Sequence, residues 1–147
     1  MATFIYNSFR LNQFNGTAPI DFDTDDVYVA LVNSAYVANA TAQDTHDFFN
    51  DVGASEVSGT SYVSGGQSLL SKTLTMDTAN DRVDFDAADT VWSNSTITAH
   101  GAVIYKRVGT TTSVSPLIAL IDFGGAQVST AGPFTITWST PGLLRVA

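Results

Sequence analysis

The chain contains no cysteine, which excludes disulfide bonds, thiolate metal sites and cysteine nucleophiles. Basic side chains are scarce, with 6 Lys and Arg against 14 Asp and Glu, and the formal net charge is −8. Because nucleic-acid binding depends on clustered Lys and Arg, we expect no direct contact with nucleic acid. Glutamate is nearly absent, since Glu56 is the only one, and an acid content made of Asp is typical of turns rather than helices.

Long hydrophobic runs are also missing. No stretch approaches the ~20 consecutive apolar residues of a membrane-spanning helix, and the N-terminus lacks the basic segment and apolar run of a secretion signal. We therefore expect no membrane partner. The 147 residues, of which 44% are hydrophobic, suffice for a sizeable core, and we predict a single β-rich domain over residues 1–147.

The first residues predict one short helix and one buried strand. Apolar side chains over 4–14 follow a helical spacing, and Asn15-Gly16 supplies a turn that ends the helix. Residues 27–32 read Val-Tyr-Val-Ala-Leu-Val and are apolar on both faces of a strand, which indicates a buried strand.

Residues 33–66 predict a long connection rather than a regular element. We expect one helical turn or two inside it, capped by Asp44 or Thr45 and continuing to Val52. Connections of this length are uncommon in compact domains and are often functional, so this segment is a candidate interaction surface.

From residue 69 onward the chain predicts a succession of short strands. Residues 70–76 and 83–87 alternate apolar and polar side chains around a turn at 77–81, which indicates a hairpin with one wet face. Further strands are expected at 90–92, 102–105, 117–121, 134–138 and 143–144. This spacing predicts a mainly β fold, a β-sandwich or jelly-roll-like domain with one or two short helices.

Two of these strands, 102–105 and 117–121, are apolar on both faces. An antiparallel sheet normally leaves one face to water, so the second face needs a cover. Either the helix at 4–14 and the long connection cover it, or another subunit of a homo-oligomer does.

The acidic residues predict turns and a wet strand face rather than a metal site. Asp21, Asp23 and Asp25 alternate as in a calcium loop, but Asp26 and Val32 stand where an EF-hand needs Gly and Glu. We expect a solvated turn there. A second acidic group, which we expect on the wet face of the hairpin strand, consists of Asp81, Asp84, Asp86 and Asp89.

No pattern of catalytic residues is present. His46 and His100 are the only histidines, and neither belongs to a metal-binding or acid–base motif, so a capping or packing role is expected for both. No serine lies in a nucleophile-elbow motif, and no glycine-rich segment has the spacing of a phosphate-binding loop. We therefore predict no enzyme, no catalytic residue, no cofactor and no bound metal.

Several segments along nearly the whole chain resemble a family of small virion structural proteins of tailed bacteriophages. The segments that carry the resemblance are Val27–Val32, Thr45–Val52, Glu56–Tyr62, Gly65-Gly66, Val91-Trp92, Ser95–Ala99, Gly101–Lys106, Ser115–Ala119, Ile121–Gly124 and Phe134–Trp138. These motifs are structural and carry over no catalytic residue. The resemblance implies a capsid decoration (cement) protein, with a tail or head–tail junction structural protein as the alternative.

The residues and the resemblance together suggest how such a protein binds. The expected partner is the major capsid protein, which the chain contacts at subunit junctions as a homo-oligomer, with a trimer favoured. Its acidity would repel packaged DNA, so the outer capsid surface is favoured as its location, although a tail location stays possible. The candidate interface residues, chosen as aromatic side chains of the N-terminal segment and the long connection, are Phe4, Tyr6, Phe9, Tyr36, Phe48, Phe49 and Tyr62.

A host-glycan or receptor-binding module is a further alternative from a different class. An exposed Trp92, Tyr105 or Trp138 would stack on a sugar ring. Trp138 alternates with Phe134 and Ile136 in a core pattern, which argues against exposure of that ring.

Overall fold

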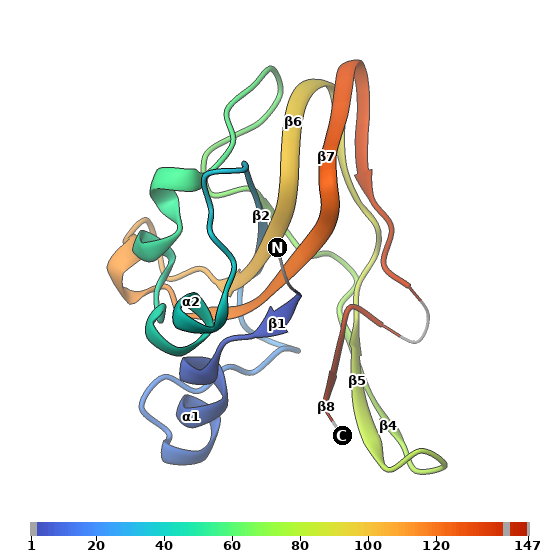
Figure 1. Ribbon diagram of the computed structural model, residues 1–147. Helices are drawn as coiled ribbons and strands as arrows, with labels where there is room; N and C mark the ends of the chain where they lie inside the picture. Colours follow the sequence, from blue (N-terminus) through green and yellow to red (C-terminus); the bar gives the residue numbers. More distant parts are fainter. Residues whose placement is uncertain (1–2, 140–141, 147) are drawn as a thin grey trace.

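A computed structural model describes residues 3–139 and 142–146 (Figure 1). Its strands are β1 (Phe4–Ile5), β2 (Val27–Val32), β3 (Gln67–Ser68), β4 (Thr73–Asp77), β5 (Arg82–Asp86), β6 (Thr90–Lys106), β7 (Leu117–Ile136) and β8 (Leu144–Val146). Its helices are α1 (Asn7–Asn15) and α2 (Ala40–Thr45), with 3₁₀ turns at Phe49–Asp51, Gly53–Ser55 and Thr112–Val114.

The strands form two antiparallel sheets. One contains five strands in the order β1-β7-β6-β2-β3, and the other contains three in the order β4-β5-β8. This arrangement confirms the predicted mainly β, sandwich-like fold with short helices.

The two longest strands, β6 and β7, pair with each other and form a bent ribbon. Their register shifts at several places between Trp92 and Gly101, and such bulges bend and twist a strand pair. Figure 1 shows the ribbon rising within the five-stranded sheet, turning over at its top and descending toward β5 and β8. The short strands predicted separately over residues 90–138 are therefore limbs of two long strands.

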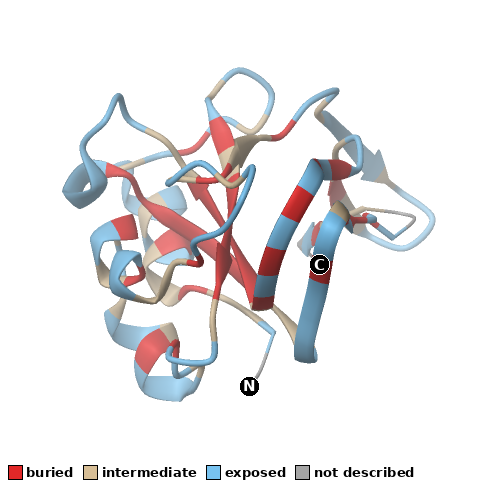
Figure 2. Cartoon of the chain, turned by 90° about the horizontal axis from the view of Figure 1, so that it is seen from above, coloured by how far each residue is buried: buried red, intermediate tan, exposed pale blue. Residues whose placement is uncertain are grey.

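The core lies between the five-stranded sheet and the elements packed on its two sides. Figures 1 and 2 show the helices and the long connection on one side of this sheet and the descending limb of the ribbon on the other. All side chains of 27–32, 102–105 and 117–121 are buried within the isolated chain except those of Tyr28 and Ile121, which are partly buried. The chain itself therefore covers both faces, and no second subunit is needed there.

The descending limb contributes alternate side chains to this core. Trp92, Phe134 and Ile136 point inward and are buried, while their neighbours are exposed, and Figure 2 shows the alternation as bands along the strand. This is the period-2 burial of a strand with one face toward a core.

The helices differ in detail from the predicted positions. Helix α1 begins after a short strand and ends at Gly16, which adopts a left-handed φ of 69°. In the long connection, Asn39 caps α2 by accepting a hydrogen bond from the N–H of Ala42 at 2.9 Å. The predicted cap residues Asp44 and Thr45 instead lie in the last turn of α2, and only 3₁₀ turns follow.

The predicted hairpin is present as β4 and β5, but the prediction that all the acidic residues of β5 face solvent is only partly correct. Asp84 is buried, and its carboxylate accepts from Arg82 Nε at 3.1 Å and from Arg145 Nε at 3.0 Å. Strand β8 pairs with β5 and brings Arg145 opposite Asp84, which the local alternation could not indicate. A buried carboxylate needs such partners because its desolvation is costly.

Candidate interaction surface

The acidic turn at residues 21–26 uses its carboxylates to hold its own backbone. Asp21 Oδ1 accepts from the N–H of Asp23 at 3.0 Å, and Asp25 Oδ2 accepts from the N–H of Asp21 at 2.8 Å. Asp25 also pairs with Lys106 Nζ at 2.8 Å. Hydrogen bonds from Thr24 and Asp23 lower the pKa of Asp21. Over the described ranges, no group of three or more acids and histidines is placed to hold a metal ion.

A chain of hydrogen bonds joins the start of α1 to the end of α2. The hydroxyl groups of Tyr6 and Tyr36 lie 2.7 Å apart, and the Tyr36 hydroxyl lies 2.8 Å from His46 Nδ1. Both tyrosines are buried, and burial is the main cause that raises the pKa of each. These hydrogen bonds hold the start of α1 against the end of α2.

The free energy of unfolding is expected to fall steeply above about pH 10. Burial raises the pKa values of Tyr6, Tyr36, Tyr62 and Tyr105 in the folded chain. Below the ordinary tyrosine pKa of about 10, these tyrosines are protonated in both the folded and the unfolded chain, so the full stability of the fold is present. Above that pH the unfolded chain loses their protons first, so the free energy of unfolding falls by about 1.4 kcal/mol per pH unit for each such tyrosine. Urea unfolding from pH 7 to 11 measures the free energy of unfolding against pH. Tyr62→Phe should make its decrease with pH less steep, and an unchanged decrease would contradict the contribution assigned to Tyr62.

Most of the predicted interface side chains belong to the core of the chain. Tyr6, Phe9, Tyr36 and Phe49 are buried and offer no contact area to a partner, so the prediction needs correction for these four. Phe49 stacks on Tyr105 with ring centroids 4.1 Å apart, which explains its position. The remaining three predicted residues are half-buried, and a contact through them stays a prediction: Phe4, Phe48 and Tyr62.

Tyr62 has a structural role in the segment that leads into β3. Its hydroxyl donates to Glu56 Oε1 at 2.8 Å and accepts from the N–H of Leu31 at 2.9 Å. Glu56 also accepts from the N–H of Gly65 at 2.6 Å and from Ser64 Oγ at 2.8 Å. The only glutamate of the chain therefore folds the 56–66 segment around its own carboxylate.

Glu56→Gln is expected to lower the free energy of unfolding by about 1–3 kcal/mol. The NH₂ group of the glutamine would lie against N–H or O–H donors at a position where the carboxylate oxygen accepts hydrogen bonds from them. Chemical denaturation of the purified variant measures the loss. Asp81→Asn is the matched control, since Asp81 is exposed in the β4–β5 turn. Equal stability of the two variants would contradict the role assigned to Glu56.

An apolar groove lies between α1 and the three-stranded sheet, and we call it the α1 groove. It has a volume of about 440 Å³. Its lining contains three aromatic rings in contact, with an edge contact at 5.7 Å between the centroids of Phe9 and Phe22 and a tilted contact at 4.4 Å between those of Phe22 and Phe85. The complete lining is Ile5, Phe9, Arg10, Gln13, Phe14, Ile20, Phe22, Leu74, Val83, Phe85, Leu144 and Arg145.

Large apolar side chains around this groove are exposed to solvent. Phe14 on α1 is 93% exposed, Leu74 on β4 is 53% exposed, and Met76 next to the lining is 73% exposed. Leu74 and Met76 lie on the face of the hairpin that was predicted to be covered. Exposed apolar groups gathered around a concave surface are typical of a protein-binding site.

The charges at the α1 groove are opposite in sign to the net charge of the chain. Among the described residues that line it, the charged ones are Arg10 and Arg145. Arg145 pairs with Asp84, whereas Arg10 donates to the side-chain oxygen of Asn7 at 2.6 Å. The groove therefore fits a partner segment with apolar anchors and carboxylates beside them.

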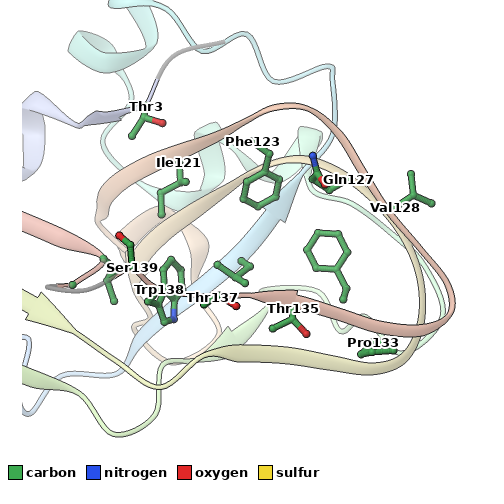
Figure 3. A pocket seen from close by; sticks show the side chains of 14 residues that line it. Thr3, Ile121, Phe123, Gln127, Val128, Pro133, Thr135, Thr137, Trp138 and Ser139 are labelled. Atoms are coloured by element: carbon green, nitrogen blue, oxygen red, sulfur yellow. The ribbon is translucent and has the colours of Figure 1, made fainter.

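A second cavity lies between the two limbs of β7, and we call it the ribbon cleft. Its volume is about 530 Å³. Figure 3 shows Phe123 and Gln127 on one limb and Pro133, Thr135 and Trp138 on the segment that descends from the bend. The cleft is a consequence of the bend in the ribbon, and its walls mix apolar and hydroxyl side chains.

The three rings that were predicted to stack on a sugar are not available on the surface. Trp92, Tyr105 and Trp138 are all buried. The indole Nε1 of Trp138 donates to the carbonyl oxygen of Ala88 at 3.1 Å, which anchors the ring inside the fold. Trp92 lies in an edge contact with Phe134 at 6.0 Å between centroids.

Comparison with protein-family models, with curated proteins and with solved structures finds no match for this chain. In the described part of the chain, no helix has both the length and the apolar character required to span a membrane.

Proposed function

We propose that this chain is a non-enzymatic structural protein of a tailed-bacteriophage virion, a capsid decoration (cement) protein that binds the outer surface of the major capsid lattice. The observation that supports this most is the α1 groove, where exposed apolar side chains surround an aromatic lining in an otherwise acidic chain. Such a surface binds a protein partner by burial of apolar area rather than by chemistry. The proposed partner is the major capsid protein, bound by a homo-oligomer with a trimer favoured.

The charge distribution supports an outer location. A net charge of −8 repels the phosphates of packaged DNA, and this repulsion disfavours the inside of a shell. The two arginines at the α1 groove would face the capsid, so that the acidic remainder faces solvent. A standard contact of ~1,600 Å² repeated over a lattice gives large total stabilisation even where each contact is weak.

The test is cosedimentation of the purified protein with phage shells that lack it, followed by a count of bound copies on a quantitative gel. Saturable binding in proportion to the major capsid protein is the expected result. A few copies per particle would instead favour a tail or head–tail junction protein. Absence of binding would overturn the proposal, and a screen against host-envelope glycans would then test the receptor-binding alternative.

A further inference from the structure

Strand β4 has an open edge that the rest of the fold leaves without a partner among the described residues. In the order β4-β5-β8 it is an outer strand of five residues, whereas the outer strands of the larger sheet, β1 and β3, have two residues each. Natural proteins protect long edges with charges, proline or bulges. The sequence of β4, Thr-Leu-Thr-Met-Asp, has no proline and a charge only at its last residue, and its pairing with β5 has no bulge.

The backbone groups at this edge belong to Leu74 and Met76. The carbonyl oxygen of Phe85 accepts from the N–H of Leu143 on the β8 side, so Phe85 bonds toward β8. Backbone groups alternate in direction along an antiparallel strand, so Asp84 bonds toward β4 and its partner Thr75 bonds toward β5. The N–H and C=O groups of Leu74 and Met76 therefore point to the open edge.

The strand is complementary to itself in one antiparallel register. If Thr75 lies opposite Thr75 of a second copy, Leu74 lies opposite Met76 of that copy and Asp77 lies opposite Thr73. Apolar side chains then meet apolar side chains, and no acid faces an acid. The same two residues, Leu74 and Met76, supply the backbone groups of the new ladder.

We propose that two copies of this chain pair through their β4 edges about a two-fold axis at Thr75, which joins their three-stranded sheets into one sheet of six strands. The pairing buries Leu74 and Met76 of both copies against each other, at 53% and 73% exposure in the single chain. A second copy is the occupant because the match in polarity, charge and backbone direction is between the strand and itself. The pairing uses Leu74, which also lines the α1 groove. Its test needs only the purified protein and no capsid, so failure of the pairing and failure of the capsid-binding proposal are distinguishable.

The register makes a cysteine experiment decisive, because the natural chain contains no cysteine. Facing Thr75 residues would form a non-hydrogen-bonded pair with Cα atoms about 4.5 Å apart, which suits a disulfide. Residue 73 of one copy would lie about 13 Å along the strand from residue 73 of the other, too far to be bridged. Thr75→Cys should therefore cross-link into a dimer under mild oxidation, and Thr73→Cys, at a position that is also exposed, should not. Equal cross-linking of both, or of neither, would overturn the proposal.

Sedimentation velocity tests the pairing without cysteine. The unmodified protein is expected to show concentration-dependent dimers below about 1 mM, and Met76→Lys should weaken them by about tenfold or more, because it places a charge opposite Leu74. Val63→Lys is the matched control, since Val63 is 71% exposed and lies outside the three-stranded sheet. A protein that stays monomeric throughout, or equal effects of the two lysine variants, would contradict the pairing.

Discussion

Gly66→Ala is expected to destabilise the fold by about 4 kcal/mol or more. A Cβ atom at this position would lie 1.9 Å from the carbonyl oxygen of Val29 and 2.7 Å from the Cα of Ala30. Both atoms are backbone atoms of the buried strand β2, so neither can move aside. Gly66 also has a φ of 73°, a backbone conformation that residues with a Cβ atom rarely adopt.

Two other glycines separate the causes of this loss. Gly16 has a similar φ of 69° but open space around its missing Cβ, so Gly16→Ala should cost only about 1 kcal/mol. Gly53 has neither the positive φ nor a close neighbour, and Gly53→Ala should change stability by less than about 0.5 kcal/mol. Urea denaturation of the three variants measures the order. If Gly66→Ala proved no worse than Gly16→Ala, the close approach of this segment to β2 would be incorrect.

Phe14→Ser is expected to lower the affinity for capsid shells by about tenfold to a hundredfold and to leave the stability of the free protein unchanged. The ring is 93% exposed, so the fold loses little when it is removed. When such a ring is buried in a protein interface, its removal commonly costs about 2 kcal/mol of binding free energy. Cosedimentation across a range of concentrations measures the affinity, and thermal unfolding measures the stability.

Val63→Ser is the control for this prediction, because Val63 is an exposed apolar residue outside the α1 groove. It should bind shells as the unmodified protein does. Arg10→Glu tests the contribution of charge. Reversal of this charge should lower the affinity for shells, and the decrease should be larger at low salt. Equal binding of Phe14→Ser and the control would remove the α1 groove from the interface while leaving a capsid role to another surface.

The strands with a local signal were predictable from the sequence. Residues 27–32 are apolar on both faces and form the buried strand β2. The turn at 77–81 joins two alternating segments, and β4 and β5 pair as predicted. In both places local preference and tertiary structure agree.

The bend of the ribbon was not predictable in the same way. Gly124 and Gly125 look like a turn between strands, and both have positive φ values, yet they lie inside β7. Bulges and turns use the same residues, and only the pairing with β6 distinguishes them. The sequence pattern therefore divided one long strand into two.

The candidate site depends on which elements cover each other, which local patterns do not contain. Alternation in β4 showed that Leu74 and Met76 share a face, but not that this face is left open beside α1. The aromatic side chains of the long connection were expected at a contact surface, whereas Tyr36 and Phe49 fill the core. An apolar side chain without a known neighbour fits either place, and the apolar spacing over 4–14 did not show that Phe14 lies exposed beside the groove.

We propose that the chain acts by binding the outside of a capsid through the α1 groove. A cryo-electron microscopy reconstruction of shells saturated with the purified protein tests it most directly. Density for this fold is expected on the outer surface, with α1 and the β4–β5 hairpin facing the major capsid protein. Density only on the inner surface or along the tail, or an outward-facing α1 groove, would contradict it.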